Sequence, residues 1–175
     1  VCYAFSYSQL SYVMPLHFEE LFGVAAGSKY MGAMWSINGF VVFAVTPIMV
    51  LLFKKRNPLF NTSIAGIGYG IGFGLYAFTQ NIIIIFLLVI IWSCGEVLAA
   101  ANTGVFIANN SPITHRARFQ SIYEIVQGIG RAFGPLLMGY FLLDHDFNQA
   151  WLLVGLISLF AVAGYYIMYK YQQRK

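Results

Sequence analysis

The sequence predicts an all-α membrane protein with six transmembrane helices. The chain is 59% hydrophobic and only 9% charged, whereas charged residues make up about a quarter of a typical soluble domain. Apolar runs of roughly 20 residues, the length that crosses the hydrocarbon core of a bilayer, recur along the chain. The Lys and Arg residues gather at the ends of these runs. The net charge of +4 therefore reflects membrane topology, and nucleic-acid binding is excluded.

The first three predicted spans cover residues 2–22, 31–53 and 60–79. The third needs a separate argument, because its glycines alternate as they would in a strand. A lone strand leaves its backbone groups unsatisfied in lipid, so a helix is expected. On a helix, the glycines spaced four residues apart form one narrow face. This face predicts close packing against another helix rather than a nucleotide-binding loop.

The last three predicted spans cover residues 82–108, 119–143 and 149–169. The first of these is strongly apolar but carries Glu96 near its middle, and the next contains Arg131 near its middle. The final span ends in a tyrosine-rich segment around Lys170, which is typical of an anchor at the membrane interface.

The basic residues predict the orientation. Eight of them lie at one side of the predicted bundle, namely Lys54, Lys55, Arg56, Arg116, Arg118, Lys170, Arg174 and Lys175. The other side carries Lys29 together with Glu19, Glu20, Asp144 and Asp146. The positive-inside rule then places both ends of the chain in the cytoplasm. The chain opens on Val1 directly into an apolar run, and we expect it to be a piece of a longer protein.

Glu96 and Arg131 are expected to lie at similar depth on antiparallel helices. An ionised side chain at the bilayer centre costs about 3 kcal/mol even on a lenient scale, so such residues face a protein interior or a water-filled path. We expect the two to form a buried ion pair. Two roles remain open for Glu96: a proton-coupling carboxylate or counter-ion for a cationic substrate, and one half of a static pair that fixes two helices.

Further polar residues predict a cavity and a gate. Glu124, Gln127 and Arg131 share one helix face, since residues three and four apart are neighbours on a helix. Because Glu124 lies near the span end, we expect it to form a cytoplasmic gate with Arg116, Arg118 or Lys54. The set that could contact a substrate is Gln9, Asn38, Asn102, Gln127 and Tyr123. Interhelical hydrogen bonds are the alternative for its buried amides.

Other chemistries find little support in the sequence. Cys2 and Cys94 stand alone within apolar segments, and the three histidines lack ligand spacing, so no metal or other cofactor is expected. No nucleophile and base share a depth in the membrane, so the protein is not expected to be an enzyme. Gly134-Pro135 removes one helical hydrogen bond and predicts a helix bend.

Several short motifs, in order and spacing, resemble the C-terminal half of a major facilitator superfamily transporter. The pieces are Tyr7-Ser8-Gln9-Leu10 with Met14-Pro15-Leu16, Met31-Gly32 with Ser36-Ile37-Asn38-Gly39 and Thr46-Pro47, Gly95-Glu96 with Asn109-Asn110-Ser111-Pro112 and Arg116, and Gly130-Arg131-Ala132-Phe133-Gly134-Pro135 with Gly139. They look like helices seven, eight, ten and eleven of that fold. The last piece also resembles a motif of drug antiporters, although Met138 stands where that motif has a glycine.

The resemblance implies that residues 1–175 form one six-helix half, built from two inverted three-helix repeats, with helices seven, eight, ten and eleven lining the cavity. It implies secondary transport by alternating access, which we expect to be proton-coupled efflux of amphipathic or hydrophobic compounds across the plasma (inner) membrane. The implied partners are the N-terminal six-helix half, the lipid bilayer, a small-molecule substrate and protons. The alternatives are an uptake symporter for a small solute and a membrane scaffold or receptor that transports nothing.

Overall fold

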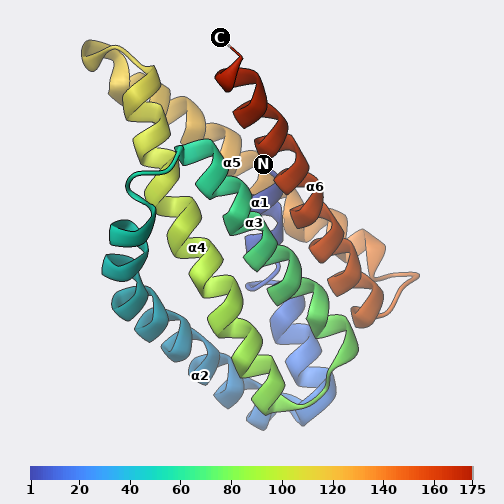
Figure 1. The fold of residues 1–175 in the computed structure, drawn as a ribbon. Coiled ribbons are helices and arrows are strands. Elements are labelled where there is room, and N and C mark those ends of the chain that lie inside the picture. Colours follow the sequence, from blue (N-terminus) through green and yellow to red (C-terminus); the bar gives the residue numbers. More distant parts are fainter. Residues whose placement is uncertain (175) are drawn as a thin grey trace.

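The computed structural model describes residues 1–174, and this part of the chain contains helices and no strand. The all-α class is therefore confirmed. Figure 1 shows a bundle of elongated helices, with α2 leaning away from the others at one end. The elements are α1 (Cys2–Ser8), α2 (Val13–Phe53), α3 (Pro58–Gly74), the short 3₁₀ helix η1 (Leu75–Phe78), α4 (Ile82–Asn110), the 3₁₀ helix η2 (Ile113–His115), α5 (Arg116–Phe141) and α6 (Phe147–Gln173).

Three stretches are long and apolar enough to cross a membrane by length and composition: Cys2–Phe53, Ile82–Asn110 and Phe147–Gln173. These stretches indicate an integral membrane protein. Helix α3 is shorter, with 17 residues, and polar side chains lower the hydropathy of α5. The division into six separate spans therefore stays a prediction.

The first two predicted spans are joined at a sharp corner. Gly23 lies inside the 41-residue α2 with φ 78° and ψ 164°, and it is the residue with positive φ among those described. A glycine adopts this backbone without steric cost. After the corner, Gly27 approaches the preceding segment so closely that an added Cβ would lie 2.9 Å from the Phe18 carbonyl oxygen. The predicted connection at 23–30 is thus mostly helical.

Helix α3 lies between α4 and α6 and packs closely against both (Figure 1). An added Cβ at Gly70 would come 2.5 Å from Leu159 Cδ2 of α6, and one at Gly72 would come 2.7 Å from Trp92 Cβ of α4. One glycine face of α3 therefore packs closely against α6, and the other packs closely against α4. The packing role predicted for these glycines is confirmed.

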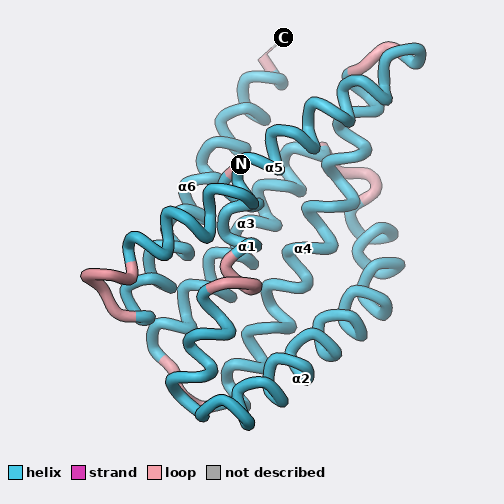
Figure 2. The backbone as a smooth tube through the Cα atoms, turned by 180° about the vertical axis from the view of Figure 1, so that it is seen from behind, coloured by secondary structure: helices cyan, strands magenta, loops and turns pink. Residues whose placement is uncertain are grey.

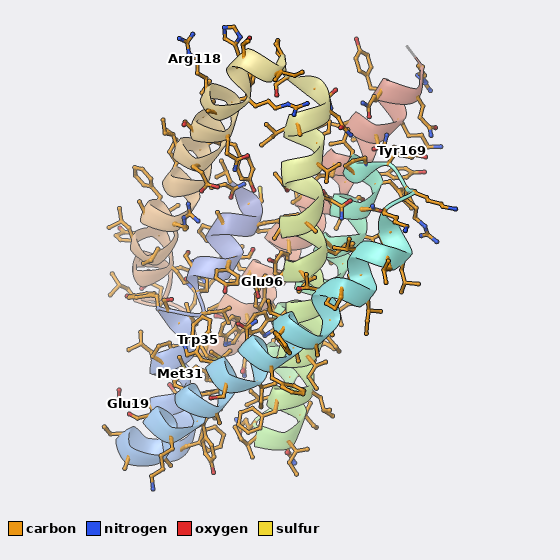
Figure 3. The ribbon with its side chains drawn as sticks, turned by 90° about the vertical axis from the view of Figure 1, so that its left-hand side faces the viewer. Glu19, Met31, Trp35, Glu96, Arg118 and Tyr169 are labelled. Atoms are coloured by element: carbon orange, nitrogen blue, oxygen red, sulfur yellow. The ribbon has the colours of Figure 1, made fainter. Side chains whose placement is uncertain are left out.

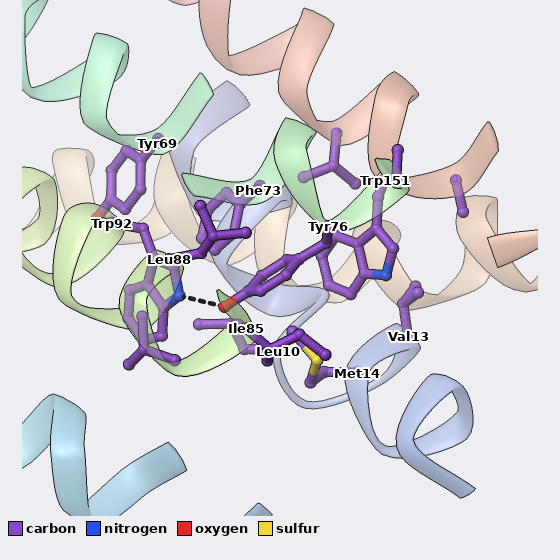
Figure 4. Packing of buried hydrophobic residues seen from close by; sticks show 14 of the residues in the cluster. Leu10, Val13, Met14, Tyr69, Phe73, Tyr76, Ile85, Leu88, Trp92 and Trp151 are labelled. Atoms are coloured by element: carbon purple, nitrogen blue, oxygen red, sulfur yellow. Dashed lines mark hydrogen bonds between the residues drawn. The ribbon is translucent and has the colours of Figure 1, made fainter. Parts of the chain in front are cut away.

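Aromatic side chains fill the core where α3, α4 and α6 meet the end of α1. Figure 4 shows Tyr76 between the indoles of Trp92 and Trp151. Trp92 Nε1 donates a hydrogen bond to the Tyr76 hydroxyl at 2.9 Å, and Trp151 Nε1 donates to His17 Nδ1 at 2.9 Å. Both buried indoles are thus satisfied, as buried Trp side chains usually are. The core links the two helices on either side of α3.

Helices α3, α4 and α6 begin at residues suited to capping. Asn57 and Asn81 each accept a backbone hydrogen bond at the starts of α3 and α4, and Pro58 takes the first position of α3, where its missing N–H costs nothing. Asp146 and Gln149 form a capping box at the start of α6. These local signals fix the helix starts at opposite ends of the bundle.

The bundle has two chemically different ends. Figure 3 shows Glu19 at one end, Arg118 and Tyr169 toward the other, and Glu96 between them. In the view from behind, α1 and α5 run side by side and α2 is inclined away from α5 (Figure 2).

Candidate functional site

A cleft of about 200 Å³ opens between helices α1, α4 and α5, with α3 at its base. Its lining residues are Tyr3, Ala4 and Tyr7 from α1, Tyr69 from α3, Glu96, Ala99, Ala100 and Thr103 from α4, and Tyr123, Glu124, Gln127 and Arg131 from α5. The cleft therefore combines an acidic side chain, an ion pair, four phenol rings and several small residues. Glu96 and Arg131, the two charged residues that the sequence places near the middle of a span, both line this cleft.

Glu96 is half-buried and lies at mid-height of the bundle (Figure 3). The residue before it, Gly95, lets α4 approach α3 closely, since an added Cβ would lie 2.7 Å from the Ala65 carbonyl oxygen. From α2, Asn38 Nδ2 donates to Glu96 Oε2 at 2.8 Å and to Ser93 Oγ at 2.9 Å. The Asn38 amide thus holds one carboxylate oxygen of Glu96.

The predicted direct ion pair between Glu96 and Arg131 does not form within residues 1–174. Arg131 Nη2 instead contacts Glu124 Oε2 at 3.1 Å, and both side chains are about half exposed, at 54% and 52%. The reason is geometric. Glu124 and Arg131 lie two turns apart on the same face of α5, whereas Glu96 lies on α4, which has few contacts with α5. Glu96 and Arg131 therefore share a cleft but not a contact.

The predicted cytoplasmic gate is also not formed as expected in the described chain. Glu124 pairs with Arg131, and Gln120 Nε2 donates to Glu124 Oε1 at 3.3 Å. Arg118 lies at the far end of the bundle (Figure 3). Neither Arg116 nor Arg118 lines the cleft, so Glu124 belongs to the cleft and the basic residues to the bundle end.

Four tyrosines give the cleft an aromatic wall, and contacts with other helices hold the rings of Tyr3 and Tyr7. The Tyr3 hydroxyl donates to the Thr62 carbonyl oxygen at 2.9 Å, and its ring stacks on Tyr165 with centroids 5.2 Å apart. Tyr7 meets Trp92 edge-on at 6.2 Å. The Tyr7 hydroxyl also interacts electrostatically with Glu96. Aromatic surface and a carboxylate thus face the same space.

Of the five predicted substrate-contacting residues, Gln127 and Tyr123 line the cleft. Gln9 is fully buried and donates to the Phe5 carbonyl oxygen at 2.9 Å, while its Oε1 has no partner in the described structure. Asn102 accepts from Asn61 Nδ2 at 2.7 Å. Asn38 binds Glu96 rather than lining the cleft. Asn38 and Asn102 thus form interhelical hydrogen bonds, the alternative expected for them, whereas the hydrogen bonds of Gln9 stay within residues 5–9.

Other cleft residues were not predicted. Ala99, Ala100 and Thr103 follow Glu96 at three, four and seven positions, the spacing that places residues on one helix face. Their small side chains leave room beside the carboxylate. That spacing was available in the sequence and would have identified them, whereas the contributions of Tyr3 and Tyr69 depend on how α1 and α3 pack.

Helix α5 reaches the cleft because it packs tightly on α1. An added Cβ at Gly130 would lie 2.5 Å from the Val1 carbonyl oxygen, and one at Gly134 would collide with Ser8 Oγ. Pro135 lies inside α5, which continues as one helix to Phe141. Gly134 thus serves close helix packing, and the predicted bend at Gly134-Pro135 stays a prediction.

Among curated proteins, the chain is similar to an uncharacterized MFS-type transporter, YqjV, of Bacillus subtilis (strain 168). The two are 25% identical over 103 residues, which is 59% of this chain and 25% of the relative. The match thus spans only a quarter of the relative's length. No family model matches the chain, and no solved structure matches it. The similarity supports a relation to transporters of the major facilitator superfamily.

Proposed function

We propose that the chain forms one six-span half of a secondary transporter of the major facilitator type, which moves a small molecule by alternating access. The similarity to an MFS-type transporter supports transport in general. The long apolar helices support insertion in a membrane. The other half of the transport path is supplied by a second six-span unit, and the cleft between α1, α4 and α5 is one wall of that path.

The observation that carries the proposal is Glu96, a carboxylate at mid-height that opens into the cleft. Within residues 1–174, Glu96 accepts a hydrogen bond from the Asn38 amide and interacts with the Tyr7 hydroxyl, and it forms no ion pair with a cation. An ionised carboxylate at this depth is costly unless a proton or a bound cation neutralises it. Glu96 therefore takes up a proton in one state of the cycle and releases it in another.

The cleft chemistry favours amphipathic or hydrophobic compounds. Tyr3, Tyr7, Tyr69 and Tyr123 offer ring faces, and Gln127 and Thr103 offer hydrogen-bonding groups. Binding pockets of this kind are largely apolar with a few polar groups that set orientation. We further propose that transport is efflux across the plasma (inner) membrane, with protons moving in the opposite direction.

The direction of coupling can be read from the pH inside proteoliposomes that contain the full-length protein. The vesicles start without a gradient, hold a pH-sensitive dye, and receive ethidium outside, a permanently charged aromatic cation that cannot itself carry a proton. Antiport predicts that the lumen becomes more alkaline as ethidium enters. Protein-free vesicles serve as the control.

Acidification of the lumen would assign the protein to symport and contradict the efflux proposal. A panel of neutral and cationic aromatic compounds extends the test. If compounds are transported but none changes the lumen pH, proton coupling is rejected, and only the proposal that the protein is a transporter remains.

A further inference from the structure

A second groove, of about 190 Å³, lies apart from the cleft, where the end of α2 meets the start of α3 and the outer part of α4. Its walls are mostly apolar, and its lining residues are Met49, Val50, Phe53, Lys54, Arg56, Pro58, Leu98, Ala101, Asn102, Val105 and Asn109. No acidic residue lines it. The groove thus has an apolar interior and a cationic rim.

The two cations at the rim are available to a ligand. Lys54 and Arg56 are exposed, and neither forms an ion pair within residues 1–174. The Arg56 guanidinium lies 5.1 Å above the Phe53 ring, which holds it beside the groove. Two cations without an ion-pair partner, next to an apolar surface, are complementary to an amphiphile with an anionic head.

The groove is held in shape by polar contacts between helices. Asn61 Nδ2 of α3 donates to the Phe53 carbonyl oxygen at 3.1 Å and to Asn102 Oδ1 at 2.7 Å. Asn57 Nδ2 reaches Gln172 Oε1 of α6 at 3.0 Å. These bonds join the end of α2 to α3, α4 and α6. The rim residues therefore stand on a fixed framework rather than on a free loop.

We propose that this groove binds an anionic phospholipid, with its phosphate between Lys54 and Arg56 and the first part of one acyl chain along Val50, Ala101 and Val105. Basic pockets between membrane helices bind anionic headgroups in this way. The volume is below the range of pockets that enclose a whole drug-sized ligand, so the remainder of the lipid stays in the bilayer. The proposal requires membrane insertion and is independent of transport.

Native mass spectrometry of the full-length protein in detergent tests the proposal. The protein is titrated with phosphatidylglycerol or with phosphatidylcholine of the same acyl chains. One phosphatidylglycerol is expected to bind more tightly than phosphatidylcholine. Each basic side chain near an anionic surface contributes about fivefold, so the variant Lys54→Gln/Arg56→Gln should bind phosphatidylglycerol roughly 25-fold more weakly.

The matched control is Lys170→Gln/Arg174→Gln, which removes the same charge from α6 and leaves the groove lining intact. It should change binding less than about twofold. Equal losses in the two double variants, or equal binding of both lipids by the wild type, would overturn the proposal. Val105→Trp supplies a second arm, because it fills the apolar wall at a half-exposed position without changing charge. Unchanged phosphatidylglycerol binding in this variant would also overturn it.

Discussion

Asn38 and Glu96 meet between α2 and α4, and one amide group of Asn38 serves both Glu96 and Ser93. The amide fixes Glu96 Oε2 and leaves the rest of the carboxylate toward the cleft. Hydrogen bonds to charged groups are stronger than neutral ones. At the residue scale, Asn38 therefore positions the proposed coupling group and ties two helices together.

Removing this amide should cost stability. Asn38→Ala is expected to lower the unfolding free energy by about 1–2 kcal/mol, given that membrane interhelical hydrogen bonds contribute about 0.6–1.7 kcal/mol. Ser93→Ala should be milder, and the double variant should show coupling, because the two residues share a contact. Unfolding in mixed detergent micelles measures both. The exposed Asn148→Ala is the control, and an equal effect there would contradict the assigned contact.

The ion pair of α5 should behave differently. Arg131 and Glu124 are both about half exposed, and exposed pairs contribute at most about 1 kcal/mol. Arg131→Gln should therefore change the unfolding free energy by less than about 1 kcal/mol. Transport should fall and should recover in the charge-exchanged variant Glu124→Arg/Arg131→Glu. A loss of stability above about 2 kcal/mol would contradict the exposed setting of the pair.

Sequence spacing identified the charged residues of the cleft but not their pairing. The face shared by Glu124, Gln127 and Arg131 follows from helix periodicity alone. Which carboxylate Arg131 contacts depends on the rotation and separation of α4 and α5, which periodicity does not contain. Asn38 shows the same limit, because its contact with Glu96 joins residues 58 positions apart.

At the element scale, α3 determines how closely the bundle can pack. One glycine face meets α6 and the other meets α4. Small residues permit such close approach in membranes, where van der Waals contact drives association. The glycines thus act through the space they leave rather than through backbone freedom.

A methyl group on the α4-facing side of α3 tests this packing. Gly72→Ala places a Cβ 2.7 Å from Trp92 Cβ and 3.0 Å from its backbone nitrogen, so the helices must shift. The expected loss is about 1–3 kcal/mol, as for other overpacked sites. Gly104→Ala on α4 has open space around its Cβ and should be unchanged or slightly more stable. Equal effects in a detergent unfolding assay would contradict the tight interface.

Helix positions were largely predictable, whereas two breaks in the first half were not predicted. Residues 23–30 were expected to form a loop, but beyond Gly23 they are helical; Ala25 and Ala26 favour this. The first span is interrupted before Val13. Pro15 explains the restart, because a proline is tolerated in the first turn of a helix and costs a hydrogen bond farther in. That signal was present in the sequence.

At the scale of the whole molecule, the charges divide the bundle into two ends. Glu19 lies at one end and Arg118 at the other (Figure 3). The end of α2, the end of α6 and the start of α5 all lie toward the same end of the bundle (Figure 1). The basic residues that predict the orientation thus lie toward one end of the structure, and we expect this end to face the cytoplasm.

Cysteine labelling in intact cells measures this orientation. Cys2 and Cys94 are first replaced by alanine, and Glu19→Cys and Arg118→Cys are then introduced separately. A membrane-impermeant maleimide should label position 19 from outside and position 118 only after permeabilisation. The reverse pattern would invert the proposed topology and, with it, the assignment of the basic end to the cytoplasm.

The central claim, that Glu96 couples proton movement to transport, is tested most directly by Glu96→Gln in the full-length protein reconstituted in vesicles. The amide keeps the shape of the side chain and one oxygen that can accept from Asn38, but it cannot take up or release a proton. Transport driven by a pH gradient should fall at least tenfold, while substrate exchange without a gradient persists; one decade corresponds to about 1.4 kcal/mol. Glu19→Gln, at the bundle end, should leave both rates unchanged. Gradient-driven transport at the wild-type rate in Glu96→Gln would contradict the account.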